Sequence, residues 1–166
     1  MKQFIRALYG ILVAGVLING PVRAYEIAAG NLVITQGWIR TTPGRARVGD
    51  AYLTIENKGT APDRLTGASA DFADKVQLRE MAVNGEAMSM HPVDNGVVIE
   101  PGKTLKLAPG DLHLMLLGLK WPLRQGEKVA ITLEFEKGQQ VGVPLEVGGL
   151  ARRGLQIRMT RAGRWR

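Results

Sequence analysis

The sequence contains no cysteine among its 166 residues. Without a thiol the chain can form no internal disulfide, no thiolate zinc site, no iron–sulfur ligation, no cysteine nucleophile and no lipid anchor on cysteine. A blue-copper site is excluded too, because it requires a thiolate. Serine and histidine are scarce, and the chain holds only Ser69, Ser89, His91 and His113. The sequence also lacks P-loop, GxGxxG and HExxH motifs, so we expect a protein that is not an enzyme.

Positive charge is concentrated at the two ends of the chain. The formal net charge is +7, with 22 basic and 15 acidic residues. Residues 1–24 hold three basic residues, and residues 151–166 hold six arginines and no acid. Residues 25–150 therefore carry 13 basic against 15 acidic residues, a net charge of −2. This mildly acidic middle lacks the basic footprint of a nucleic-acid-binding domain, and we expect no nucleic-acid partner.

The first 24 residues are typical of a cleaved signal peptide. Lys2 and Arg6 precede an apolar run over residues 7–18, and Asn19-Gly20-Pro21 ends it. Small residues follow at Val22 and Ala24. Signal peptidase recognises small residues at these two positions and would cleave after Ala24. The run is too short to span a bilayer, which needs about 20 residues. We expect export to the periplasm, with an uncleaved anchor as the alternative. The domain would then cover residues 25–150.

From residue 31 onward short β-type segments alternate with turn residues. The segments cover residues 32–40, 51–57, 75–83, 97–100, 105–107, 112–117, 129–136 and 141–147. Turn pairs separate them, namely Asn84-Gly85, Asn95-Gly96, Pro101-Gly102, Pro109-Gly110, Gln125-Gly126 and Lys137-Gly138. Strands at this spacing, without a helical period or an internal repeat, predict a single all-β domain built as a β-sandwich or barrel.

Methionine and histidine gather in one stretch of the chain. Apart from Met1 and Met159, the methionines are Met81, Met88, Met90 and Met115, and both histidines lie in the same region. A two-residue turn at Asn84-Gly85 predicts a hairpin that pairs Val83 with Glu86, Met81 with Met88 and Arg79 with Met90. Residues 79, 81, 88 and 90 then share one face of the hairpin, and His113 shares a face with Met115. Thioether and imidazole donors without cysteine suit Cu(I) better than zinc or calcium.

A second interpretation of the same pattern remains open. Methionine commonly fills gaps in hydrophobic cores, so these residues could be packing groups of the sandwich interior. His91 is the weaker ligand candidate, because alternation places it on the face opposite to Met90 and Pro92 follows it directly.

Residues 31–147 resemble the periplasmic copper chaperones called PCu(A)C. The resemblance rests on Trp38-Ile39-Arg40, residues 51–59, Asp63-Arg64-Leu65, residues 76–81, Met88-Ser89-Met90 and residues 109–119. It implies a cupredoxin-like Greek-key β-sandwich that binds Cu(I) through methionine and histidine. It also implies delivery of copper toward the CuA centre of cytochrome c oxidase, beside Sco-type proteins.

The family's ligand positions transfer to this sequence with one departure. The resemblance assigns ligands to Met90, His113 and Met115, but the first ligand position holds Arg79. A guanidinium has no free lone pair and keeps its positive charge, so it repels Cu(I). Three outcomes follow: Arg79 turns to solvent and leaves a three-ligand site, Met81 or Met88 supplies a fourth ligand, or copper binding is lost.

The sequence therefore predicts an extracytoplasmic Cu(I) metallochaperone that passes copper to an acceptor such as cytochrome c oxidase subunit II or a Sco-type protein. The alternative is a relative with a degenerate site that acts as a metal-free interaction module. Residues 151–166 form an Arg-rich segment that we interpret as a flexible, solvated tail. Contact of this tail with anionic lipid or an acidic partner is the other interpretation, at about 1 kcal/mol for each arginine near a charged membrane surface.

Overall fold

The computed structural model describes residues 26–84 and 87–148, except for the side chains of residues 83, 84, 87 and 88. The predicted signal peptide and the Arg-rich tail lie outside the described residues. Within them the elements are β1 (Ile27–Ala29), β2 (Leu32–Arg40), β3 (Val48–Asn57), β4 (Asp63–Ser69), β5 (Lys75–Asn84), β6 (Ala87–Pro92), β7 (Val97–Ile99), β8 (Thr104–Leu107), β9 (His113–Leu117), β10 (Lys128–Phe135) and β11 (Gln140–Gly148). None of the residues described forms a helix long and apolar enough to cross a membrane.

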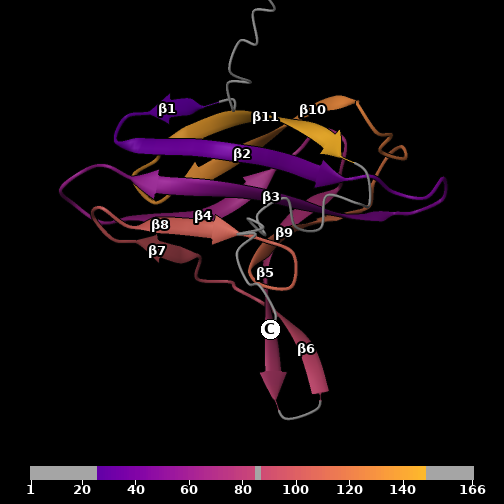
Figure 1. Ribbon diagram of the computed structural model, residues 1–166, viewed down its shortest axis with the longest axis horizontal. Helices are drawn as coiled ribbons and strands as arrows, with labels where there is room; N and C mark the ends of the chain where they lie inside the picture. Colours follow the sequence, from indigo (N-terminus) through magenta and orange to yellow (C-terminus); the bar gives the residue numbers. More distant parts are fainter. Residues whose placement is uncertain (1–25, 85–86, 149–166) are drawn as a thin grey trace, which may run out of the picture.

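The strands form one continuous hydrogen-bonded path that curls into a sandwich (Figure 1). Its order is β6-β5-β9-β3-β2-β11-β10-β4-β7, while β1 pairs with β2 and β8 pairs with β3. β11 runs parallel to β2, and the other strand pairs are antiparallel. The hairpin of β5 and β6 thus lies at one end of this path, and β4 and β7 lie at the other end.

Alternating apolar side chains fill the space between the two sides. In β11 every second residue from Val141 to Val147 is buried, and the residues between them are exposed. In β3 the buried, inward-pointing residues are Ala51, Leu53 and Ile55. This period of two is what places one face of each strand in the core, where burial of a Leu or Ile side chain stabilises the fold by about 1.5–3 kcal/mol. The predicted all-β, single-domain, cupredoxin-like sandwich is confirmed.

The predicted strands agree with the structure to within three residues at each end, but two strands were not predicted. These are β1 and β4. β4 contains Asp63 and Gly67, residue types that have little tendency to form strands. It is a strand because it pairs with β10 on one side and β7 on the other.

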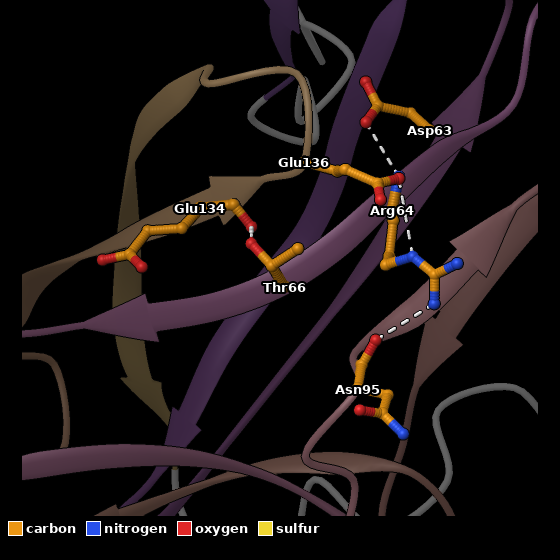
Figure 2. A network of polar contacts seen from close by, with 6 residues as sticks. All are labelled: Asp63, Arg64, Thr66, Asn95, Glu134 and Glu136. Atoms are coloured by element: carbon orange, nitrogen blue, oxygen red, sulfur yellow. Dashed lines mark hydrogen bonds and ion pairs between the residues drawn. The ribbon is translucent and has the colours of Figure 1, made fainter.

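Polar contacts hold β4 against its neighbours (Figure 2). Arg64 Nε lies 3.5 Å from Glu136 Oε2, and Arg64 Nη1 donates to the carbonyl oxygen of Asn95 at 3.1 Å. Thr66 Oγ1 donates to the Glu134 carbonyl oxygen at 3.0 Å. The network joins β4 to β10 and to the loop before β7, so a segment with low β-propensity is fixed by long-range contacts.

Glycines at the predicted turns adopt the left-handed backbone conformation that those turns require. Positive φ angles are found at Gly96, Gly102, Gly110, Gly126 and Gly138. Gly96 differs from the others because a Cβ there would collide with the backbone carbonyl oxygen of Leu65. This position therefore needs glycine both for its φ angle and for the close approach of β4.

Replacing Gly96 by alanine is expected to destabilise the protein by about 2 kcal/mol, since the left-handed conformation alone costs about 1–2 kcal/mol for an L-residue and the collision adds to it. Urea denaturation followed by fluorescence measures the change. Gly102→Ala is the matched control, because it has the same sign of φ and no heavy atom near the added Cβ. Equal losses in the two variants would show that the contact with Leu65 contributes nothing.

Candidate metal centre

The candidate ligands lie on the surface of the sheet that faces away from the core. Ile39, Ala51, Leu78 and Leu114 point inward and are buried. Their sequence neighbours point to the other side, and we call this surface the site face. Its members are Trp38, Arg40, Asp50, Tyr52, Gln77, Arg79, Met81, Met90, His113 and Met115. The predicted grouping of Met81 with Met90 and of His113 with Met115 on common faces is confirmed, and these residues are not part of the apolar interior.

A β-bulge in β2 completes the site face. The register with β3 shifts between Thr35 and Trp38, and Gln36 has a φ angle of 56°. The extra residue keeps Trp38 and Arg40 on the same side as Tyr52 and Asp50, as bulges beside functional sites commonly do. The Trp38 and Tyr52 rings then pack with centroids 4.5 Å apart, and the Arg40 guanidinium lies 5.6 Å from the Tyr52 centroid.

His113 is held in a defined orientation at the start of β9. Its side chain is buried, with 4% of the residue exposed, and its ring centroid lies 6.4 Å from that of Tyr52. Nδ1 lies 2.8 Å from the carbonyl oxygen of Asp111. A carbonyl oxygen only accepts, so Nδ1 carries the proton and Nε2 of the neutral ring has a free lone pair. Such a hydrogen bond is the usual support of a metal-binding histidine.

Arg79 and Met115 are in direct contact. Arg79 is the cross-strand partner of His113, and Met115 follows His113 by two residues on the same face. Arg79 Nη1 donates to the Met115 sulfur at 3.2 Å, and Nε is buried without a hydrogen-bond partner. Arg79 is half-buried, so of the three outcomes considered above this structure does not show the one in which it turns to solvent. The guanidinium instead lies among the candidate donors.

The hairpin β5–β6 has a different register from the one predicted. Met81 lies opposite Met90, Arg79 lies opposite Pro92 and Val83 lies opposite Met88, a shift of two residues. The cause is at the base of the hairpin, where the Val93 amide donates to the Leu78 carbonyl oxygen at 2.9 Å and Val93 packs against the core. Side chains alternate between the two faces with a period of two. A register shift of two residues therefore leaves each side chain of the hairpin on the face that was predicted for it.

The hairpin projects beyond the body of the sandwich (Figure 1). β5 pairs with β9 only up to Arg79 and continues to Asn84 with β6 as its partner. Met90 is 41% exposed on this projection, and Met81 opposite it is half-buried. The backbone places Met88 two residues further toward the tip than Met90, and its side chain lies outside the described residues.

His91 points away from the site face. It pairs with Glu80, and Nε2 lies 2.8 Å from Ser89 Oγ. The expectation that alternation places it opposite to Met90 is confirmed. In the described part of the chain, no three His, Asp or Glu side chains gather closely enough to hold a metal ion. Any site here depends on thioethers.

Three rows of side chains define what the site face can bind. The first row crosses the sheet through Tyr52, His113 and Arg79, and Met115 lies in the next row toward Asp50. The row of Met81 and Met90 lies on the opposite side of Arg79. Neighbouring rows are about 6.8 Å apart along a strand, which methionine side chains from both sides can bridge. The donor set of one imidazole and neutral thioethers fits Cu(I), and the Arg79 charge opposes it.

Asp50 offsets part of the positive charge of the site face. Its Oδ2 lies 3.5 Å from Arg40 Nη1, and its Oδ1 lies 4.0 Å from His113 Nε2. Asp50, Tyr52 and Arg40 were not predicted from the sequence as neighbours of the site. Alternation within residues 50–52 indicates that Asp50 and Tyr52 share a face, but only the pairing of β3 with β9 brings these residues to His113.

Comparison with known proteins places this arrangement in a family. Residues 32–147 match the family described as "Putative lipoprotein LpqE-like". The "Putative lipoprotein Lxx21020" of Leifsonia xyli subsp. xyli is 34% identical over 120 residues, which are 71% of each chain.

Solved structures show the same fold. The apo PCuAC domain from PmoF1 is 25% identical with a TM-score of 0.64, over 75% of this chain and 99% of that domain. The Cu(I) form of DR1885 from Deinococcus radiodurans is 28% identical with a TM-score of 0.54, over 76% of this chain and 81% of that one. The resemblance to PCu(A)C proteins is thereby confirmed. The chain belongs to the LpqE-like family and has the cupredoxin-like β-sandwich of PCuAC domains.

Proposed function

We propose that the protein is an extracytoplasmic metallochaperone that binds Cu(I) and transfers it to an acceptor protein. The observation that carries the proposal is the state of His113, whose Nε2 lone pair is fixed by the Nδ1 bond to Asp111 and lies on the same face as Met115. The match to the Cu(I) form of DR1885 supports the choice of metal. The lipoprotein names of its relatives support a location outside the cytoplasm.

The proposed ligands are His113 Nε2 and the sulfur atoms of Met115 and Met90, with Met81 beside Met90 as a further thioether. Met88 stays a candidate from sequence alone. Neutral thioethers and one imidazole bind Cu(I) without fixing it as firmly as thiolates do. Copper can therefore leave by ligand exchange, and no bond-making catalysis is needed. The proposed acceptors are the CuA site of cytochrome c oxidase subunit II or a Sco-type protein.

A second candidate function is favoured by the contact between Arg79 and Met115. If the guanidinium holds the sulfur permanently, the site face is a metal-free surface for docking a partner protein. The contact distance of 3.2 Å joins a strong donor to a weak acceptor, so it gives little energy to resist a competing metal.

An anaerobic Cu(I) titration against a bathocuproine-type competitor tests the proposal. We expect the wild type to bind one equivalent, and His113→Ala to weaken binding about thirtyfold, about 2 kcal/mol, since the variant loses the only imidazole on the site face. His91→Ala is the matched control, because that ring lies on the opposite face of the hairpin. Equal losses in both variants, or no binding by the wild type, would favour the metal-free module.

A further inference from the structure

Arg79 is a half-buried cation that no anion compensates within the described residues. Among the described residues its side chain makes one hydrogen bond, from Nη1 to the Met115 sulfur, and Nε is buried without a partner. No Asp or Glu of the described chain lies within ion-pair distance of it. A guanidinium offers five N–H donors, and thioether sulfur is a weak acceptor. The arrangement leaves strong N–H donors of Arg79 without the anionic acceptor that would stabilise them.

The nearest carboxylates do not supply that anion. Asp50 pairs with Arg40 and lies beside His113, one row away from Arg79. Glu80 is next in sequence but points to the opposite face of the hairpin with His91. A Cu(I) ion held by neutral ligands would add a second positive charge next to Arg79. The binding of an anionic ligand from outside the chain would offset both charges.

We propose that Arg79 forms an anion subsite beside Met115 that receives a thiolate and holds it against Cu(I) during transfer. The inference rests on the proposed function, and it names the chemistry of the group that takes the copper. A thiolate is a soft anion, so it binds Cu(I) more strongly than a thioether does and also accepts N–H donors. Arg79 thus weakens the resting copper site and stabilises the complex from which copper leaves.

The exchange step conserves charge and oxidation state. The acceptor thiol first loses its proton to solvent, and the thiolate sulfur then donates an electron pair to Cu(I). The bond between Cu(I) and the Met115 sulfur breaks, and the thioether keeps its electron pair. Copper stays in the +1 state throughout, and the freed Met115 sulfur can again accept from Arg79 Nη1.

Transfer rates to two kinds of acceptor test the subsite. Cu(I)-loaded wild type and Arg79→Gln are mixed with neocuproine, which is uncharged, and separately with a Cys-x-x-x-Cys peptide or with N-acetylcysteine. We expect the ratio of the thiolate rate to the neocuproine rate to fall at least tenfold in Arg79→Gln. A fall with the peptide alone assigns the subsite to a protein acceptor, and a fall with both assigns it to thiolates in general. Arg47→Gln, which removes an exposed arginine elsewhere, should leave the ratio unchanged.

A metal-free measurement gives an independent readout. Addition of sodium iodide, a soft anion, should shift the Arg79 Nε–H resonance in the NMR spectrum more than that of Arg47. An unchanged rate ratio in Arg79→Gln, or equal iodide shifts at both arginines, would overturn the subsite while copper binding stands. Failure of both the wild type and Arg79→Gln to bind Cu(I) would instead contradict the proposed function.

Discussion

Replacing Arg79 by histidine is expected to tighten Cu(I) binding by about 100- to 1,000-fold. Arg79 pairs with His113 and contacts Met115, so its charge lies within a few ångströms of any metal held by these residues. Two unit charges 4 Å apart repel by about 4 kcal/mol at an effective dielectric constant of 20. The substitution removes this repulsion and adds an imidazole next to His113 on the site face.

Competition with a bathocuproine-type ligand measures the affinity, and X-ray absorption at the copper edge reports the change in ligands. Arg79→Gln separates the two effects, because it removes the charge without adding a strong ligand. Arg79→Gln should therefore show part of the gain in Cu(I) affinity that is expected for Arg79→His. Arg47→Gln controls for the change in net charge, since that side chain is exposed, precedes β3 and pairs with Asp74. An Arg79→His protein with wild-type affinity would show that the thioethers and His113 do not converge on one ion.

The strand pattern and the turns were predictable because they depend on local rules. Alternation in residues 141–147 and the positive φ at Gly96 follow from the period of a strand and from the backbone freedom of glycine. β4 could not be predicted in this way. Its sequence carries Asp63 and Gly67, and its conformation depends on pairing with two strands that are distant in the chain.

The candidate site was predictable in its members and not in its geometry. The two-residue spacing of His113 and Met115 places these two on one face of their strand, and the hairpin pairing places Met81 and Met90 on one face of the hairpin. The turn rule predicted that Arg79 lies opposite Met90, but anchoring of Val93 at the base of the hairpin places Met81 there. The contact of Arg79 with the Met115 sulfur depends on the pairing of β5 with β9, for which the sequence has no local signal.

The buried side chain of Asn57 fixes the turn that follows β3. The residue is 1% exposed at the end of β3. Its Nδ2 donates to the carbonyl oxygens of Ala61 and Ile99, both at 2.9 Å, and its Oδ1 accepts from the Gly59 amide at 2.9 Å. The Asn-Lys-Gly sequence signals the turn at Gly59, since asparagine side chains commonly bond two residues ahead. The bond to Ile99 joins β3 to β7 across the core.

Replacing Asn57 by alanine is expected to destabilise the protein by about 4 kcal/mol. Three hydrogen bonds are lost. The Ile99 carbonyl oxygen, left buried without a partner, costs about 1–3 kcal/mol, and the part-buried bonds to Ala61 and Gly59 contribute about 1 kcal/mol each. This is a large part of the 5–15 kcal/mol that holds a typical domain folded, so the midpoint of urea unfolding should fall sharply. Gln140→Ala, at an exposed amide side chain on β11, should change stability by less than about 0.5 kcal/mol. A loss below about 1 kcal/mol in Asn57→Ala would mean that water replaces the amide at Ala61, Ile99 and Gly59.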